Sequence, residues 1–177
     1  MTLGPARVKG LVKPFEAHVP SLGAGCYVAE GALVIGDVIL GPESSIWYGT
    51  VLRGDVMPIR VGARSNLQDL TVVHTTTGVS TVHVGDEVTV GHRVILHGCT
   101  LHDRVLVGMG AIVLDNAVVE SDVVIGAGAL VPPGARLAGG YLYLGAPAKR
   151  VRPLRDGDRA MIDAGWQAYV DLGRRHG

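Results

Sequence analysis

Three histidines, His74, His92 and His97, are the residues whose type and spacing most directly suggest chemistry. Neutral imidazole is the commonest protein ligand of transition metals. Three imidazoles on one Zn²⁺ leave a coordination position open for water, and the metal lowers the pKa of that water to about 7. We interpret the three histidines as a candidate metal site, on the condition that the fold brings them together.

The fold is indicated by an aliphatic residue at every sixth position, often followed at once by glycine or alanine. An amphipathic helix would repeat at three and four residues and an ordinary strand at two. A six-residue period is typical of a parallel β-helix built from short strands and tight turns. Only 5% of the residues are aromatic, as a narrow core requires. The repeat consists of Leu22, Val28, Val34, Leu40, Ile46, Leu52, Val61, Leu67, Val73, Val84, Val90, Leu96, Leu101, Val107, Val113, Val119, Ile125 and Val131.

Three hexapeptides make one coil, so the inward residues form three columns, which start at Leu22, Val28 and Val34. The period is interrupted only after third-column residues. Loops are therefore expected to leave the β-helix at one corner, near residues 54–60 and 75–83.

Arg53, His74 and His97 each follow a third-column residue directly. They should stack at one corner on successive coils, about 4.8 Å apart. His92 lies two residues after second-column Val90 and belongs to another corner of its own coil. A neighbouring chain around a threefold axis can present it. The spacing predicts a homotrimer with three metal sites, each with two histidines from one chain and one from the next.

Several motifs resemble those of the γ-class carbonic anhydrases, and the resemblance covers roughly residues 10–175. The matching segments are Val51-Leu52-Arg53-Gly54-Asp55, Asn66-Leu67-Gln68-Asp69, His74, Val90-Gly91-His92, Leu96-His97-Gly98-Cys99 and Leu144-Gly145-Ala146-Pro147-Ala148-Lys149. The resemblance implies an all-β, left-handed parallel β-helix, a trimer, and zinc on the three histidines, with Fe²⁺ or Co²⁺ in some relatives. It also implies hydration of CO₂ to bicarbonate by metal-bound hydroxide.

The remaining site residues are assigned from their chemistry and this resemblance. The amide of Gln68 can hydrogen-bond the hydroxide or bicarbonate, and Asn66 lies on the same side because strand residues alternate. Asn66 is alternatively a turn-stabilising residue. Arg53 and Asp55 are expected to form an ion pair, which either supports the site or only orients the subunits.

One departure from the family pattern concerns proton export, because the most active prototype carries acidic loops near its metal. Here the segments after Asp55 and His74 contain no glutamate. We expect slow or undetectable turnover, with the proton leaving through water, buffer or another group such as His83. Two different functions fit the same scaffold. One is an acyl- or acetyltransferase or thioesterase that uses acyl-CoA, with His74 as base, and the other is a catalytically silent metal-binding trimer.

Composition limits the partners and the compartment. The formal net charge of zero argues against nucleic acid and anionic membranes. No apolar stretch reaches transmembrane length, and a cytoplasmic location is expected. Cys26 and Cys99 are interpreted as small buried residues.

The chain divides into a lead-in segment (1–20), a β-helix domain (21–153) and a C-terminal helix (154–177), which Asp156 or Asp158 is expected to cap. The helix should pack through one apolar stripe, formed by Met161, Ile162, Trp166, Tyr169, Val170 and Gly173. Trp47 and Tyr48 are assigned to interface packing. The other histidines, His18, His83, His102 and His176, are interpreted as turn residues.

Overall fold

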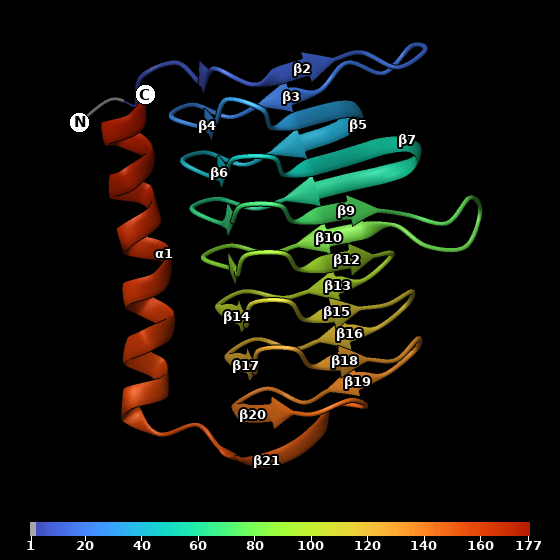
Figure 1. The fold of residues 1–177 in the computed structure, drawn as a ribbon, viewed down its shortest axis with the longest axis vertical. Helices are drawn as coiled ribbons and strands as arrows, with labels where there is room; N and C mark the ends of the chain where they lie inside the picture. The colour runs from blue at the N-terminus through green and yellow to red at the C-terminus, as the bar shows by residue number, and fades with distance from the viewer. Residues whose placement is uncertain (1–2) are drawn as a thin grey trace.

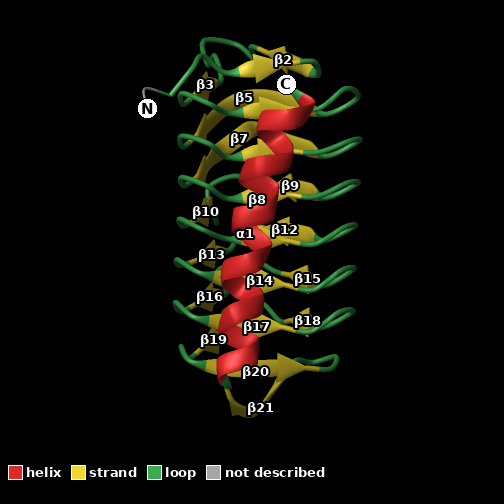
Figure 2. Ribbon diagram, turned by 90° about the vertical axis from the view of Figure 1, so that its left-hand side faces the viewer, coloured by secondary structure: helices red, strands yellow, loops and turns green. Residues whose placement is uncertain are grey.

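The computed structural model describes residues 3–177, so the first two residues of the expected lead-in lie outside it. The chain forms a parallel β-helix of about eight turns with one long helix along its side (Figure 1). In Figure 2 each coil runs from the strands at the left, across the front, to those at the right while it descends. This course is left-handed, and it confirms the predicted fold class.

The β-helix has three faces, each formed by one column of short strands. The first face consists of β3 (Ser21–Leu22), the second half of β5 (Leu33–Leu40), the second half of β7 (Val51–Val61), β10 (Val82–Val84), β13 (Thr100–Leu101), β16 (Val118–Val119) and β19 (Arg136–Leu137). The second face consists of β1 (Arg7–Val8), β4 (Tyr27–Val28), β6 (Ser45–Ile46), β8 (Asn66–Leu67), β11 (Thr89–Val90), β14 (Val105–Val107), β17 (Val123–Ile125) and β20 (Tyr141–Leu144), with β21 (Lys149–Pro153) antiparallel at its end. The third face consists of β2 (Leu11–Lys13), the first halves of β5 and β7, β9 (Val72–His74), β12 (Ile95–His97), β15 (Ile112–Val113) and β18 (Leu130–Val131).

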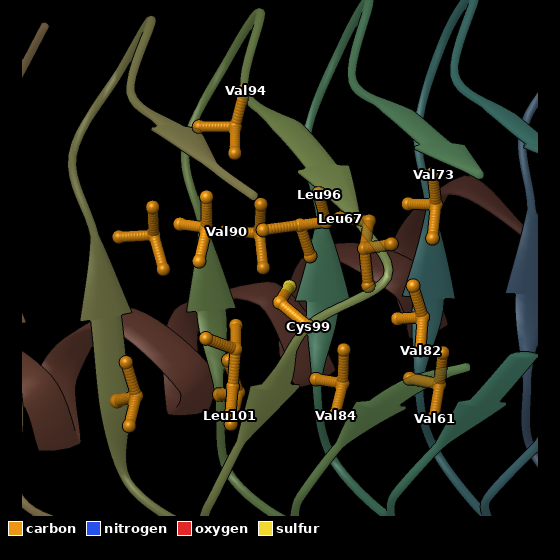
Figure 3. Packing of buried hydrophobic residues seen from close by; sticks show 14 of the residues in the cluster. Val61, Leu67, Val73, Val82, Val84, Val90, Val94, Leu96, Cys99 and Leu101 are labelled. Carbon is orange, nitrogen blue, oxygen red and sulfur yellow. The ribbon is translucent and has the colours of Figure 1, made fainter. Parts of the chain in front are cut away.

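The pairing register confirms the three predicted columns. In the third column, for example, Val73 pairs with Leu52 on one side and Leu96 on the other. All three belong to one buried core, and Figure 3 shows Val73 and Leu96 pointing into it toward inward residues of the other two faces. Every repeat residue is buried except Leu22, which is partly buried near the end of the β-helix. Continuous burial of aliphatic side chains is the main stabilising contribution to such a fold.

Two expectations about the chain path change. Residues 54–60 are not a loop, because they belong to the 11-residue strand β7, which bends across the corner and joins the third face to the first. Residues 75–81 do leave the β-helix between β9 and β10 as a projecting loop (Figure 1). The expected lead-in also pairs with the β-helix, because β1 pairs with β4 and β2 with β5.

Helix α1 (Asp156–His176) runs along the second face (Figure 2). Its N-cap residue is Arg155, whose backbone N–H donates to the Asp158 carboxylate at 2.7 Å, so Asp158 contributes to the cap as expected. Ile162, Val170 and Gly173 are buried in the predicted stripe, whereas Met161 is 47% exposed and does not belong to it.

An aromatic cluster fastens α1 to the β-helix. Trp47 is buried and stacks edge-on with Tyr27 and Tyr169, at centroid distances of 5.3 and 5.1 Å. Trp47 therefore packs beneath its own helix, and its assignment to a subunit interface is wrong. Two histidines interpreted as turn residues are not in turns, because His176 belongs to α1 and bonds to Tyr48, and His83 belongs to strand β10.

Two further sequence predictions concern the cysteines and the membrane. Cys26 and Cys99 are both buried and free, as expected. Within the described residues, no helix is both long and apolar enough to cross a membrane.

Candidate metal centre

His74 and His97 lie side by side at the corner where the third face ends. Strands β9 and β12 are neighbours in parallel register, which pairs His97 directly with His74. Their ring centroids are 5.4 Å apart at an interplanar angle of 60°. The predicted stacking of these histidines on successive coils is therefore confirmed, and two imidazoles are close enough to share one metal ion.

Asp55 and Arg53 belong to the same corner through the bend in β7. Asp55 Oδ1 lies 3.1 Å from His74 Nε2, and its Oδ2 accepts a hydrogen bond from Arg53 Nη1 at 2.5 Å. Partial burial raises the pKa of Asp55, but the hydrogen bonds from Arg53 and His74 outweigh it and hold the pKa below its ordinary value. The expected ion pair is present, and it places a carboxylate anion against His74.

Asp115 supports His97 in the same way. Its Oδ2 lies 3.0 Å from His97 Nδ1, while its Oδ1 accepts hydrogen bonds from Ser80 at 2.6 Å and Thr76 at 2.9 Å. Burial raises the pKa of Asp115, but the hydrogen bonds from Ser80, His97 and Thr76 lower it below its usual range. Asp115 thus fixes the ring of His97 and ties it to the projecting 75–81 loop. We call Arg53, Asp55, His74, His97 and Asp115 the histidine-pair edge.

The third histidine lies at the preceding corner, where the second face meets the third. His92 Nδ1 is 2.8 Å from Asp69 Oδ2. Gln68 Nε2 donates to Asn66 Oδ1 at 3.2 Å, and Asn66 in turn donates to Thr89 at 3.0 Å. Asn66 and Gln68 are buried in the single chain. We call Asn66, Gln68, Asp69 and His92 the single-histidine edge.

The third face separates these two edges, so one chain does not assemble the whole predicted site. Within residues 3–177, no group of three or more His, Cys, Asp or Glu side chains is arranged to hold a metal ion. The structure joins Arg53, Asp55, His74 and His97 at one edge, but it places Asn66, Gln68 and His92 at the other.

The outer surface of the third face is a continuous aliphatic ladder. Its outward residues pair in succession from coil to coil, and all are at least partly exposed. They are Leu11, Leu33, Val51, Val72, Ile95, Ile112 and Leu130. The outward residues of the first face are mostly polar or charged, with Arg60, His83 and Thr100 at its centre. Because α1 covers the second face, the third is the apolar face that no other element of residues 3–177 covers.

Comparison with known proteins identifies the family. No family model matches the chain. It is 44% identical over 176 residues to "Gamma carbonic anhydrase 2, mitochondrial" of Arabidopsis thaliana, which covers 97% of this chain but only 63% of the plant protein. It is 40% identical over 164 residues to "Carbonic anhydrase" of Geobacillus kaustophilus, covering 93% of this chain and 90% of that protein. The chain belongs to the γ-carbonic anhydrase family.

A solved structure titled as a hexapeptide transferase family protein from Anaplasma phagocytophilum superposes with a TM-score of 0.90 at 41% identity. The alignment covers 94% of this chain and 98% of that one. The γ-carbonic anhydrase family therefore shares its hexapeptide-repeat scaffold with proteins that carry transferase names.

For this member of the γ-carbonic anhydrase family, sequence reasoning missed the carboxylates beside His92 and His97. Asp69 was detectable, because both Asp69 and His92 lie two residues after paired second-column residues, Leu67 and Val90. Asp115 was harder to find. Asp115 lies two residues after third-column Val113, whereas His97 lies only one residue after the paired Leu96. The register therefore does not predict their contact, and only the geometry of the turn brings them together.

Proposed function

We propose that the chain forms a homotrimer that binds zinc between subunits and hydrates CO₂ to bicarbonate. The observation that carries this proposal is the exposed aliphatic third face, which has His74 and His97 along one border and His92 along the other. Contiguous exposed apolar surface of this kind marks an interaction site in soluble proteins. A second copy of this chain is the occupant that would complete the histidine set.

The heights of the histidines support a threefold assembly. Val90 and Leu96 occupy consecutive positions of one coil, so His92 and His97 lie at the same level of the β-helix. His74 lies one coil away. Rotation about an axis parallel to the β-helix involves no translation along that axis. The His92 of one chain therefore stays at the level of His97 in the next chain. His92 of one chain can then meet His74 and His97 of the next in a closed ring.

The residues fit zinc, although the single chain provides only part of the ligand set. Each histidine is held by one carboxylate through one ring nitrogen, namely Asp55 on His74, Asp69 on His92 and Asp115 on His97. Such carboxylate–histidine pairs are typical around zinc, because they orient the ring and raise its basicity. Zinc bound by the three imidazoles would supply a water molecule that ionises near neutral pH.

The chain's own polar groups then divide the remaining work. Gln68, fixed by Asn66, presents an amide that can orient the bicarbonate oxygens at the subunit boundary. Arg53 and Asp55 hold His74 in place and keep the charge of the edge balanced. These roles for Asn66, Gln68, Arg53 and Asp55 are part of the proposal.

A second candidate is transfer of an acyl group from coenzyme A, which the transferase name of the Anaplasma relative favours. His74 would then act as the general base. Neither acyl transfer nor thioester hydrolysis on the same scaffold requires His92 to be paired with a carboxylate. We therefore rank both reactions below CO₂ hydration. The third candidate is a trimer that binds metal but does not hydrate CO₂. It would use the three histidines, but it would give the amide of Gln68 no substrate to bind.

The test is stopped-flow CO₂ hydration by protein purified without chelator and reloaded with zinc, or anaerobically with Fe²⁺ or Co²⁺. His97→Ala should lose both metal and activity, whereas His102→Ala, on an exposed turn, should lose neither. A fully metallated trimer that fails to hydrate CO₂ in any buffer would refute the proposal. Acyl-CoA substrates would be tried next.

A further inference from the structure

A hollow of about 300 Å³ opens beside the histidine-pair edge. One wall is the bend of β7, with Asp55 and residues 56–58. The rest of the lining consists of Glu16 and His18, from the segment between β2 and β3, and Asp37 from β5. A space of this size and polarity can hold several water molecules, each of which occupies about 30 Å³ in the liquid.

A tight turn fixes His18 at the mouth of this hollow. Phe15 and His18 form an antiparallel bridge in which each backbone N–H donates to the other's carbonyl at 3.0 Å. Glu16 adopts the left-handed backbone conformation, with φ of 51°, that closes the turn. These bonds use backbone atoms alone, so the side chain of His18 takes no part in holding the turn.

The polar side chains around the hollow become more exposed from Asp55, which contacts His74, to Asp37 and then His18. The Asp55 side chain, which contacts His74, is 17% exposed, that of Asp37 is 24% exposed, and that of His18 is 58% exposed. His18 Nδ1 lies 4.0 Å from Asp37 Oδ2, and Arg60 Nη1 lies 2.7 Å from Asp37 Oδ1. The hollow therefore joins the partner of a candidate ligand to an exposed imidazole.

We propose that His18 is the proton acceptor of the hydration reaction, an inference that rests on the proposed function. One CO₂ and one water become one bicarbonate and one proton. The proton crosses the water in the hollow to the His18 imidazole, which becomes imidazolium and then releases the proton to buffer. Histidine suits this step because an imidazole nitrogen can accept a proton and release it again, and histidine is the side chain most often used for proton transfer. His83 lies outward on the first face and does not line the hollow, so it is a poorer candidate.

The test compares His18→Ala with His102→Ala, a matched exposed histidine on a turn, in zinc-loaded protein. Proton export follows the hydration step, so in dilute buffer His18→Ala should lower kcat at least about tenfold and leave kcat/KM unchanged. Added imidazole should restore kcat. His102→Ala should match the parent, and His18→Gln provides a second variant should the alanine weaken the turn.

A second readout does not depend on activity. In cobalt-loaded protein the ring protons of His18 should relax much faster than those of His102, because His18 shares the hollow with Asp55, which contacts His74, whereas His102 does not line it. An unchanged kcat in His18→Ala, failure of imidazole to restore it, or slow relaxation at His18 overturns this inference alone. A metallated parent that hydrates no CO₂ in any buffer overturns both this inference and the proposed function.

Discussion

Replacing Asp115 by alanine should weaken zinc binding without unfolding the β-helix. Asp115 accepts hydrogen bonds from His97, Ser80 and Thr76 at the edge of the core, and no core aliphatic residue depends on it. Without the carboxylate, the His97 ring loses the partner that fixes its orientation and directs its free nitrogen toward a metal.

The size of the effect follows from the bond that is lost. A hydrogen bond to a charged group contributes about 1.5–3 kcal/mol, and the His97 and Asp115 side chains are only 29% and 24% exposed. Since about 1.4 kcal/mol corresponds to a factor of ten, we expect zinc affinity to fall roughly 10- to 100-fold. Asp115→Asn, which can keep an acceptor oxygen toward His97, should fall between the alanine variant and the parent.

The assay is competition for zinc with a chromophoric chelator, at a protein concentration where the parent and variant have the same mass by light scattering. Ser80→Ala is the matched control, because it removes one donor to Asp115 and leaves the His97 contact in place. Equal zinc affinity of Asp115→Ala and the parent would refute the role assigned to this carboxylate.

Three further predictions address the interface, the core and the helix cap. Ile95→Asp places a charge on the aliphatic third face and should shift light scattering from trimer to monomer, whereas Thr100→Asp on the first face should not; a trimeric Ile95→Asp would exclude this face as the interface. Burial raises the pKa of Cys99 to about 12, so iodoacetamide at pH 8.5 should leave it unmodified in the native protein and label it after denaturation. Hydrogen bonds from Arg152 and from the backbone of Arg155 lower the pKa of Asp158 to about 2, below its unfolded value of about 3.9. Its stabilising effect is therefore present above about pH 4 and is lost as the pH falls toward 2, so the Tm difference between the parent and Asp158→Asn should close over that interval.

The sequence was sufficient to predict the core, because every inward position of a β-helix carries the same kind of residue. A six-residue period specifies three columns, and the columns specify that His74 stacks on His97. The sequence was less informative about the places where the chain bends. The interruption after Leu52 was read as a loop, yet β7 continues through it, because its residues pair with β5 across the corner.

Side chains at the corners were predicted only where register alone determined their contacts. Arg53 and Asp55 are two residues apart on one strand, and their ion pair follows from that spacing. Trp47 could not be assigned correctly, because the helix that covers it, which carries its partner Tyr169, comes more than a hundred residues later, and nothing in the repeat indicates which face the helix covers. The contacts of Asp115 with Ser80 and Thr76 depend on the path of the projecting loop, which follows no period.

The division of the histidines between two edges has a physical consequence for assembly. The core closes within one chain from apolar residues that include no histidine, so the β-helix does not require a metal to fold. The metal would instead be bound only where two copies meet, and its binding free energy would add to that of the aliphatic face. Any ligand that binds the assembled state alone stabilises that state by mass action. In the proposed trimer, zinc affinity and subunit affinity are therefore linked, and a substitution at either the ladder or the histidines weakens both.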